Sequence, residues 1–179
     1  MTFKYSMYVM LVVLMVSACN TTSESDRMDE CIFCEIVHNP KRHYVIWEDV
    51  DYMAFLSIYP NTDGVTVVIP KRHYPSHVEH VPNEVLAGTM LAAKKVQRLL
   101  QAALPDVGRV GFVIEGLGVN HLHVKLFPLH GTANHRKVFK SKVNTYIPEY
   151  DGYISTHNYY NYSDERLKKV YERIKRYQE

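Results

Sequence analysis

Hydrophobic and polar positions follow two different periods along the chain. Between residues 83 and 104, apolar side chains recur every three or four positions, which predicts a long helix ended by Pro105. A second helical pattern begins near Ser163, with acidic residues in its first turn and basic residues near its end. The remaining apolar runs are short and rich in β-branched and aromatic residues, which predicts strands within 44–58, 62–73, 109–116 and 119–131. The sum is a mostly antiparallel sheet with a few helices, an α+β domain.

The stretch "VNHLHVKLFPLHG", residues 119–131, places basic side chains at every second position. Because side chains of a strand alternate between faces, His121, His123 and Lys125 are expected to share one face. The aliphatic residues between them would then enter the core; they are Leu122, Val124 and Leu126. A half-buried strand with a polar outer face explains this pattern without any chemistry. The concentration of metal-capable and basic groups on one face instead favours a functional strand.

Size and charge limit the classes of function. The chain has 179 residues and a hydrophobic fraction of 46%, enough for one domain with an ordinary core plus tails. Its formal net charge of +2 is too small to indicate a nucleic acid polymer or a polybasic membrane patch as partner.

The first residues resemble a processing signal. Lys4 precedes the apolar run 8–16, which is too short to span a bilayer, and the small residues of "VSAC" lead to Cys19. This resembles a bacterial lipoprotein signal. The signal segment would span residues 1–19 and end at Cys19, which would be lipidated and become the new N-terminus. Residues 20–30 would form a polar tether. The protein would then sit at the cell envelope, and the lipid would be its only contact with the membrane. Alternatively, translation begins at Met28 and gives a cytoplasmic protein.

Five segments, taken in order, resemble the histidine triad (HIT) family. They are "CIFCEIV", "AFLSIYP", "GVTVVIPKRH", a helix, and "NHLHVKLFP". The resemblance covers residues 31–130 and leaves 131–179 as a C-terminal extension with the final helix. It implies a mostly antiparallel five-stranded sheet with a long helix and a C-terminal helix, and a homodimer.

The resemblance implies chemistry at the α-phosphate of a nucleotide. The middle histidine of the family motif, which maps onto His123, attacks phosphorus and forms a nucleotidyl-histidine intermediate. The first motif histidine maps onto His121, and the third is replaced by Lys125, which still supplies positive charge to a phosphate. Hydrolysis or nucleotidyl transfer is therefore expected, on dinucleoside polyphosphates or nucleoside phosphoramidates, with no cofactor required for catalysis. The alternative is a non-catalytic nucleotide-binding module tethered at the cell envelope.

Several positions depart from the family pattern. Ser57 stands where the family has an aspartate for the ribose hydroxyls. The link before the motif is shorter than the family's phosphate-binding loop, so Gly116, Gly118 and Asn120 are expected to replace that loop. His130, just after the strand, is a further residue expected to help bind phosphate.

The C-x-x-C motif has a separate interpretation. By resemblance to some bacterial relatives, Cys31 and Cys34 would bind a structural zinc together with His73 and His121. Two thiolates and two imidazoles suit tetrahedral zinc. A disulfide and buried free thiols are the competing states.

The C-terminal extension is rich in tyrosine: residues 146–162 hold six of the fourteen tyrosines of the chain. We expect these rings to pack on the domain, or alternatively to stack on a bound base. A third hypothesis for the whole chain is a zinc-stabilised interaction protein that uses this segment.

Overall fold

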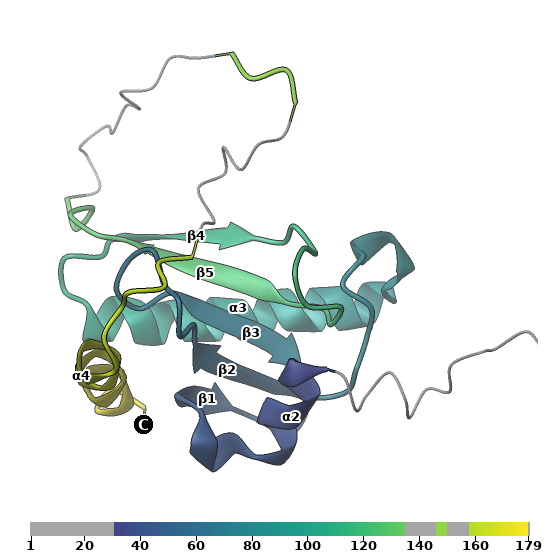
Figure 1. Ribbon diagram of the computed structural model, residues 1–179, viewed down its shortest axis with the longest axis horizontal. Helices are drawn as coiled ribbons and strands as arrows, with labels where there is room; N and C mark the ends of the chain where they lie inside the picture. Colours follow the sequence, from purple (N-terminus) through teal and green to yellow (C-terminus); the bar gives the residue numbers. More distant parts are fainter. Residues whose placement is uncertain (1–30, 135–145, 150–157, 179) are drawn as a thin grey trace, which may run out of the picture.

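A computed structural model describes residues 31–134, 146–149 and 158–178 of the chain. Its sheet has five strands in the order β1-β2-β3-β5-β4, and every neighbouring pair is antiparallel. The strands are β1 (Val45–Glu48), β2 (Tyr52–Leu56), β3 (Thr66–Pro70), β4 (Arg109–Val113) and β5 (Val124–Leu129). Figure 1 shows this sheet with its helices, and it confirms the predicted α+β fold.

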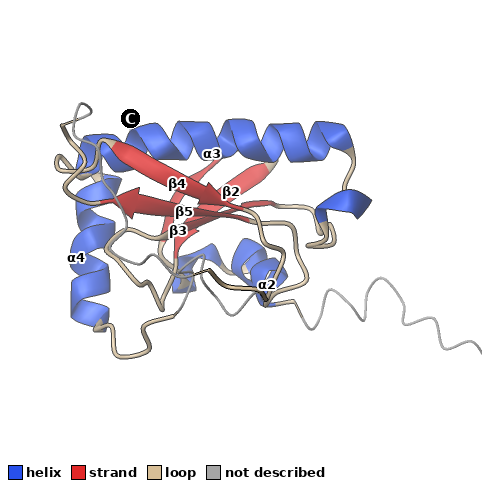
Figure 2. Ribbon diagram, turned by 90° about the horizontal axis from the view of Figure 1, so that it is seen from above, coloured by secondary structure: helices blue, strands red, loops and turns tan. Residues whose placement is uncertain are grey.

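One face of the sheet is covered by α3 (Asn83–Ala103), the long helix predicted from the sequence (Figure 2). Its buried positions recur at helical spacing and pack on the apolar residues of β2, β3 and β5. The C-terminal helix α4 (Asp164–Lys175) adds Leu167, Val170 and Ile174 to the same core. Its N-cap is Ser163, whose side chain accepts a hydrogen bond from the Arg166 backbone N–H.

The opposite face carries α2 (Ile32–His38), a short helix that the sequence pattern did not predict. Its Ile36 packs in a second apolar cluster with residues of β2 and β3, and Phe33 lies against that cluster. Seven residues are too few to show a clear helical period, so only the tertiary contacts identify this element. Two 3-10 turns complete the described elements, η1 (Pro40–Arg42) and η2 (Val78–His80).

Strand β5 corrects part of the prediction for residues 119–131. The strand begins at Val124, so both motif histidines lie in the irregular segment that precedes it. Leu122, Val124 and Leu126 are fully buried, as expected. The two histidines do not lie on the polar outer face that a half-buried strand would have, because His121 is 0% and His123 is 2% exposed. Helix α2 covers this side of the sheet, and its Phe33 ring contacts both histidines.

The predicted signal segment, the tether, Cys19 and Met28 lie outside the described residues. Within the described ranges, no helix combines the length and the apolar character needed to cross a bilayer.

Candidate functional site

A hydrogen bond to the backbone two residues earlier holds the His123 side chain in one orientation. Its Nδ1 lies 2.7 Å from the carbonyl oxygen of His121. Because a carbonyl only accepts, Nδ1 carries the hydrogen and Nε2 keeps its lone pair. Burial lowers the pKa of His123 below its usual 6.5. The hydrogen bond to the His121 carbonyl raises this pKa, the Lys125 ammonium lowers it and the Glu115 carboxylate raises it, but burial is the largest effect and the net shift is downward. The result is a neutral imidazole whose unprotonated nitrogen is Nε2.

Phe33 fixes the same ring from the side of α2. The Phe33 and His123 rings meet edge to face, with centroids 5.4 Å apart. Phe33 makes a similar contact with Phe55 of β2, also at 5.4 Å. Nothing in the local sequence marks Phe33 as part of the site, because only the docking of α2 brings it to the histidine.

Lys125 lies on β5 between Val67 of β3 and Val113 of β4. Its ammonium group forms an ion pair with Glu115, a residue that the sequence analysis did not single out. The two side chains are only 24% and 11% exposed, so this pair is largely withdrawn from water. Glu115 lies two residues beyond the strand partner of Lys125, and knowledge of the β4–β5 register would have placed the two together.

The segment between β4 and β5 is tied to the loop after β3. Ser76 donates its hydroxyl to the Gly116 carbonyl at 2.8 Å, and its backbone N–H donates to Asn120 Oδ1 at 3.1 Å. Gly116 and Gly118 both have positive φ angles, of 68° and 86°. These three residues of the expected phosphate-binding link therefore lie together, with Asn120 and Gly116 holding the link in place.

Ser57 lies beside Lys125 at a small pocket of about 30 Å³, which Val65, Val67, Phe127 and Asn158 help to line. The Ser57 hydroxyl accepts a hydrogen bond from the Tyr59 backbone N–H at 3.3 Å. Asn158 comes from the C-terminal extension, and Tyr160 of the same segment packs on Tyr59 with ring centroids 4.9 Å apart. The extension thus contributes to this pocket, and of the described tyrosines Tyr160 and Tyr162 pack on the domain.

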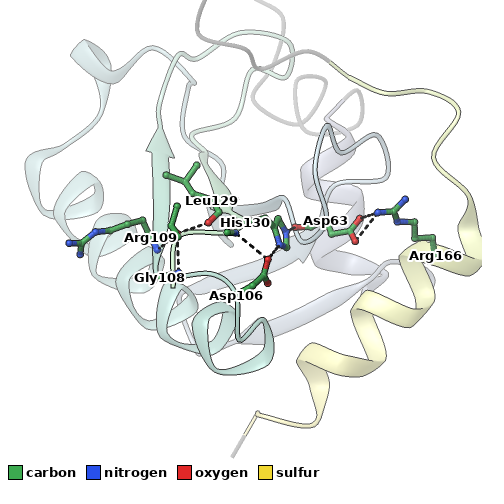
Figure 3. A network of polar contacts seen from close by, with 9 residues as sticks. Asp63, Asp106, Gly108, Arg109, Leu129, His130 and Arg166 are labelled. Carbon is green, nitrogen blue, oxygen red and sulfur yellow. Dashed lines mark hydrogen bonds and ion pairs between the residues drawn. The ribbon is translucent and has the colours of Figure 1, made fainter. Parts of the chain in front are cut away.

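His130 makes its polar contacts with Asp106 and Asp63 (Figure 3). It follows the last residue of β5, whereas His123 precedes the first, so a six-residue strand of roughly 20 Å separates them. Both its ring nitrogens are engaged, at 3.0 Å from Asp106 Oδ2 and 3.0 Å from the Asp63 carbonyl. This placement gives His130 no contact with the His123 region.

The four residues expected to bind a metal lie together. One donor atom from each of Cys31, Cys34, His73 and His121 falls within 4.8 Å of all the others. The sulfur–nitrogen distances are 3.5 Å from Cys31 to His121, 3.4 Å from Cys34 to His73 and 3.6 Å from Cys34 to His121. A tetrahedral zinc with ordinary bond lengths separates such donors by roughly 3.5 Å. The donor set therefore fits zinc, and both cysteines are free rather than joined in a disulfide.

The surroundings of His121 also favour metal binding through its Nδ1 atom. His121 Nε2 donates to the Pro70 carbonyl at 2.9 Å, which leaves the Nδ1 lone pair facing the sulfurs. Burial lowers the pKa of His121 to about 4, so its ring is neutral and able to bind a metal. Burial, together with the neighbouring Cys31 thiol, raises the pKa of the Cys34 thiol to about 12. A bound divalent cation would oppose that effect by stabilising the thiolate.

Comparisons with known proteins agree on one family. Residues 39–132 match the family model of the HIT domain. An uncharacterised HIT-like protein of Methanocaldococcus jannaschii is 32% identical, over 55% of this chain and 78% of that protein. The adenosine 5'-monophosphoramidase of Saccharomyces cerevisiae is 30% identical, over 55% of this chain and 61% of that enzyme. A zinc-bound histidine triad family protein of Mycobacterium smegmatis superposes with a TM-score of 0.57 at 20% identity, covering 84% of this chain and 97% of that structure.

Proposed function

This chain belongs to the HIT family, and on that premise we propose that it hydrolyses or transfers nucleotides at the α-phosphate. His123 is the proposed nucleophile, Lys125 the cation that meets the phosphate, and the amides of the Gly116–Asn120 link its further donors. Dinucleoside polyphosphates and nucleoside phosphoramidates are the proposed substrates. The yeast relative, a phosphoramidase by name, supports the second class.

The observation that carries this proposal is the hydrogen bond from His123 Nδ1 to the His121 carbonyl. It leaves Nε2 with a lone pair, in a ring whose neutral state is favoured by burial. A neutral imidazole is a good nucleophile near pH 7, and a covalent intermediate divides one hard displacement into two easier ones. His121 cannot act in the same way, because both of its ring nitrogens are already engaged.

We further propose that the cysteine–histidine cluster holds a structural zinc. The observed donor separations match tetrahedral geometry, and the zinc-bound mycobacterial structure shares this fold. Cys31, Cys34, His73 and His121 would be its ligands, and zinc would join α2 to the segments after β3 and before β5. His121 would then have its backbone carbonyl fixed by the metal while that carbonyl holds His123.

A trapping experiment tests the nucleophile. Wild-type protein mixed with nucleotide labelled at the α-phosphate should retain label after denaturation, and His123→Ala should retain none. Turnover by the variant should fall by about a thousandfold or more, because the covalent route is lost. His80→Ala removes an exposed histidine outside the site and serves as the matched control, with labelling unchanged. Equal labelling of wild type and His123→Ala would contradict the assignment.

A non-catalytic nucleotide-binding module is the second candidate. The lysine at the position of the third motif histidine favours it, because an ammonium group is ordinarily a weaker acid than an imidazolium. This alternative predicts that adenosine monophosphate raises Tm while neither label transfer nor product is ever detected.

A further inference from the structure

Glu115 is the charged residue nearest to Lys125 that the proposed mechanism leaves without a role. One of its carboxylate oxygens, Oε1, accepts the Lys125 ammonium. Lys125 follows His123 by two residues, and Glu115 lies two residues beyond Val113, the strand partner of Lys125. The lysine therefore does not present an isolated positive charge to a substrate. It presents half of a neutral pair.

The second carboxylate oxygen, Oε2, is buried and has no hydrogen-bond partner among the described residues. A buried acceptor without a donor is costly, and such atoms in folded proteins call for a specific explanation. A donor carried by a ligand would satisfy this oxygen. Because Lys125 holds the other oxygen and is proposed to meet the phosphate, a donor that satisfies Oε2 would come from the group that leaves that phosphate.

The two proposed substrate classes differ in this respect. A departing amine carries an N–H group and no negative charge, so it can donate to Oε2. A departing phosphate has no donor on its bridging oxygen and brings negative charge toward the Glu115 carboxylate. We infer that Glu115 is a specificity-determining residue that favours leaving groups with an N–H donor over phosphate leaving groups. This inference rests on the proposed function of the His123 site.

The proposed reaction with a phosphoramidate proceeds in two steps. The Nε2 lone pair of His123 forms a bond to the α-phosphorus, and the bond from phosphorus to the amine nitrogen breaks. The departing nitrogen keeps that electron pair and takes a proton from Lys125. Water then attacks phosphorus and gives a proton back to Lys125, while the electrons of the bond to His123 return to Nε2. Glu115 exchanges no proton; it holds Lys125 with Oε1 and accepts the departing N–H with Oε2.

The kinetic test compares two substrates on the zinc-loaded, full-length chain. Values of kcat/KM are measured for adenosine 5'-phosphoramidate and for diadenosine tetraphosphate. In Glu115→Gln, the preference for the phosphoramidate should fall about tenfold or more, because the carboxylate charge is lost. Glu115→Asp, which keeps the charge, should retain most of the preference. Glu48→Gln is the matched control, because it removes another glutamate paired with a lysine, and its preference should equal that of the wild type. An unchanged preference in Glu115→Gln would overturn the inference.

A binding measurement tests the role of Glu115 without catalytic turnover. Calorimetry compares adenosine monophosphate with adenosine diphosphate, whose second phosphate occupies the leaving-group position. Glu115→Gln should tighten the diphosphate about tenfold relative to the monophosphate, and Glu48→Gln should not. The same ratio in wild type and Glu115→Gln would reject the role of Glu115. A chain that shows this shift but never forms the His123 adduct would instead contradict the proposed catalysis, so the two failures are distinguishable.

Discussion

Gly116 shows at the scale of one residue how the loop beside His123 is constrained. Its φ angle of 68° lies in the left-handed region, which side chains with a Cβ atom rarely adopt. A Cβ atom at this position would also lie only 2.8 Å from the Ser76 carbonyl oxygen. Gly118 has a similar φ angle of 86°, but a Cβ atom there would meet nothing within 4 Å. A comparison of the two glycines therefore separates the cost of the left-handed backbone from the cost of a steric clash.

Gly116→Ala is expected to destabilise the protein more than Gly118→Ala. The Gly118 variant should lose about 1 kcal/mol of unfolding free energy, from the left-handed conformation alone. The Gly116 variant should lose about 1–3 kcal/mol more, because the added methyl group collides with backbone that cannot yield easily. Urea unfolding at 25 °C measures both values. Equal losses would show that the loop shifts away from Ser76 without cost.

Helix α2 joins the two sites at the scale of an element. It begins directly after Cys31 and contains Cys34, and between them Phe33 contacts both His121 and His123. A metal bound by the cysteines would hold this helix on the sheet, and the helix in turn covers the nucleophile. The position of α2 should therefore depend on the metal.

Zinc is expected to stabilise the wild-type protein and to have little effect on Cys34→Ser. At free zinc about a thousandfold above Kd, binding to the folded state alone adds about 4 kcal/mol to the free energy of unfolding. Calorimetric melting with added zinc and with a chelator measures this difference. His77→Ala, an exposed histidine outside the cluster, should respond to zinc like the wild type. A wild-type Tm that changes with neither zinc nor chelator would contradict the metal site.

At the scale of the whole molecule, Asp63 connects the β2–β3 link with the C-terminal helix. Its carboxylate accepts a hydrogen bond from the Arg166 guanidinium at 3.0 Å (Figure 3). It also accepts one from the Tyr162 hydroxyl at 2.7 Å. Burial raises the pKa of Asp63, but the hydrogen bonds from Arg166 and Tyr162 outweigh it and bring the pKa below 3.8. The contacts join residues about a hundred positions apart and hold α4 against the domain.

The lowered pKa predicts how this contact depends on pH. Its contribution is fully present above the unfolded value of 3.8 and is lost as pH falls through the lower pKa of the folded state. Asp63→Asn should therefore lower Tm by roughly 2–5 °C at pH 7. The deficit relative to wild type should shrink as pH falls below 3.8.

Arg166→Gln in the Asp63→Asn background provides the control for this contact. The second substitution should change Tm little once the carboxylate is gone, because its partner has been removed. A Tm deficit of Asp63→Asn that stays constant from pH 7 to pH 2.5 would show that the carboxylate charge has no part in holding α4.

The sequence by itself determined the periodic elements and the order of the motifs. The stripe of α3, the start of α4 near Ser163 and the strands of the sheet all follow from local spacing, because burial of one face requires that spacing. The C-x-x-C and the H-x-H motif likewise marked Cys31, Cys34, His121 and His123 as candidates for chemistry. These conclusions depend on residues near one another in the chain.

Tertiary structure alone decided the contacts between distant segments. The docking of α2 covered the two histidines and brought Phe33 onto His123, and β5 begins only at Val124. The register of β4 on β5 placed Glu115 beside Lys125, and the length of β5 separated His130 from the site. Such contacts depend on how whole elements pack, which no local pattern encodes, because packing energy is shared among residues far apart in sequence.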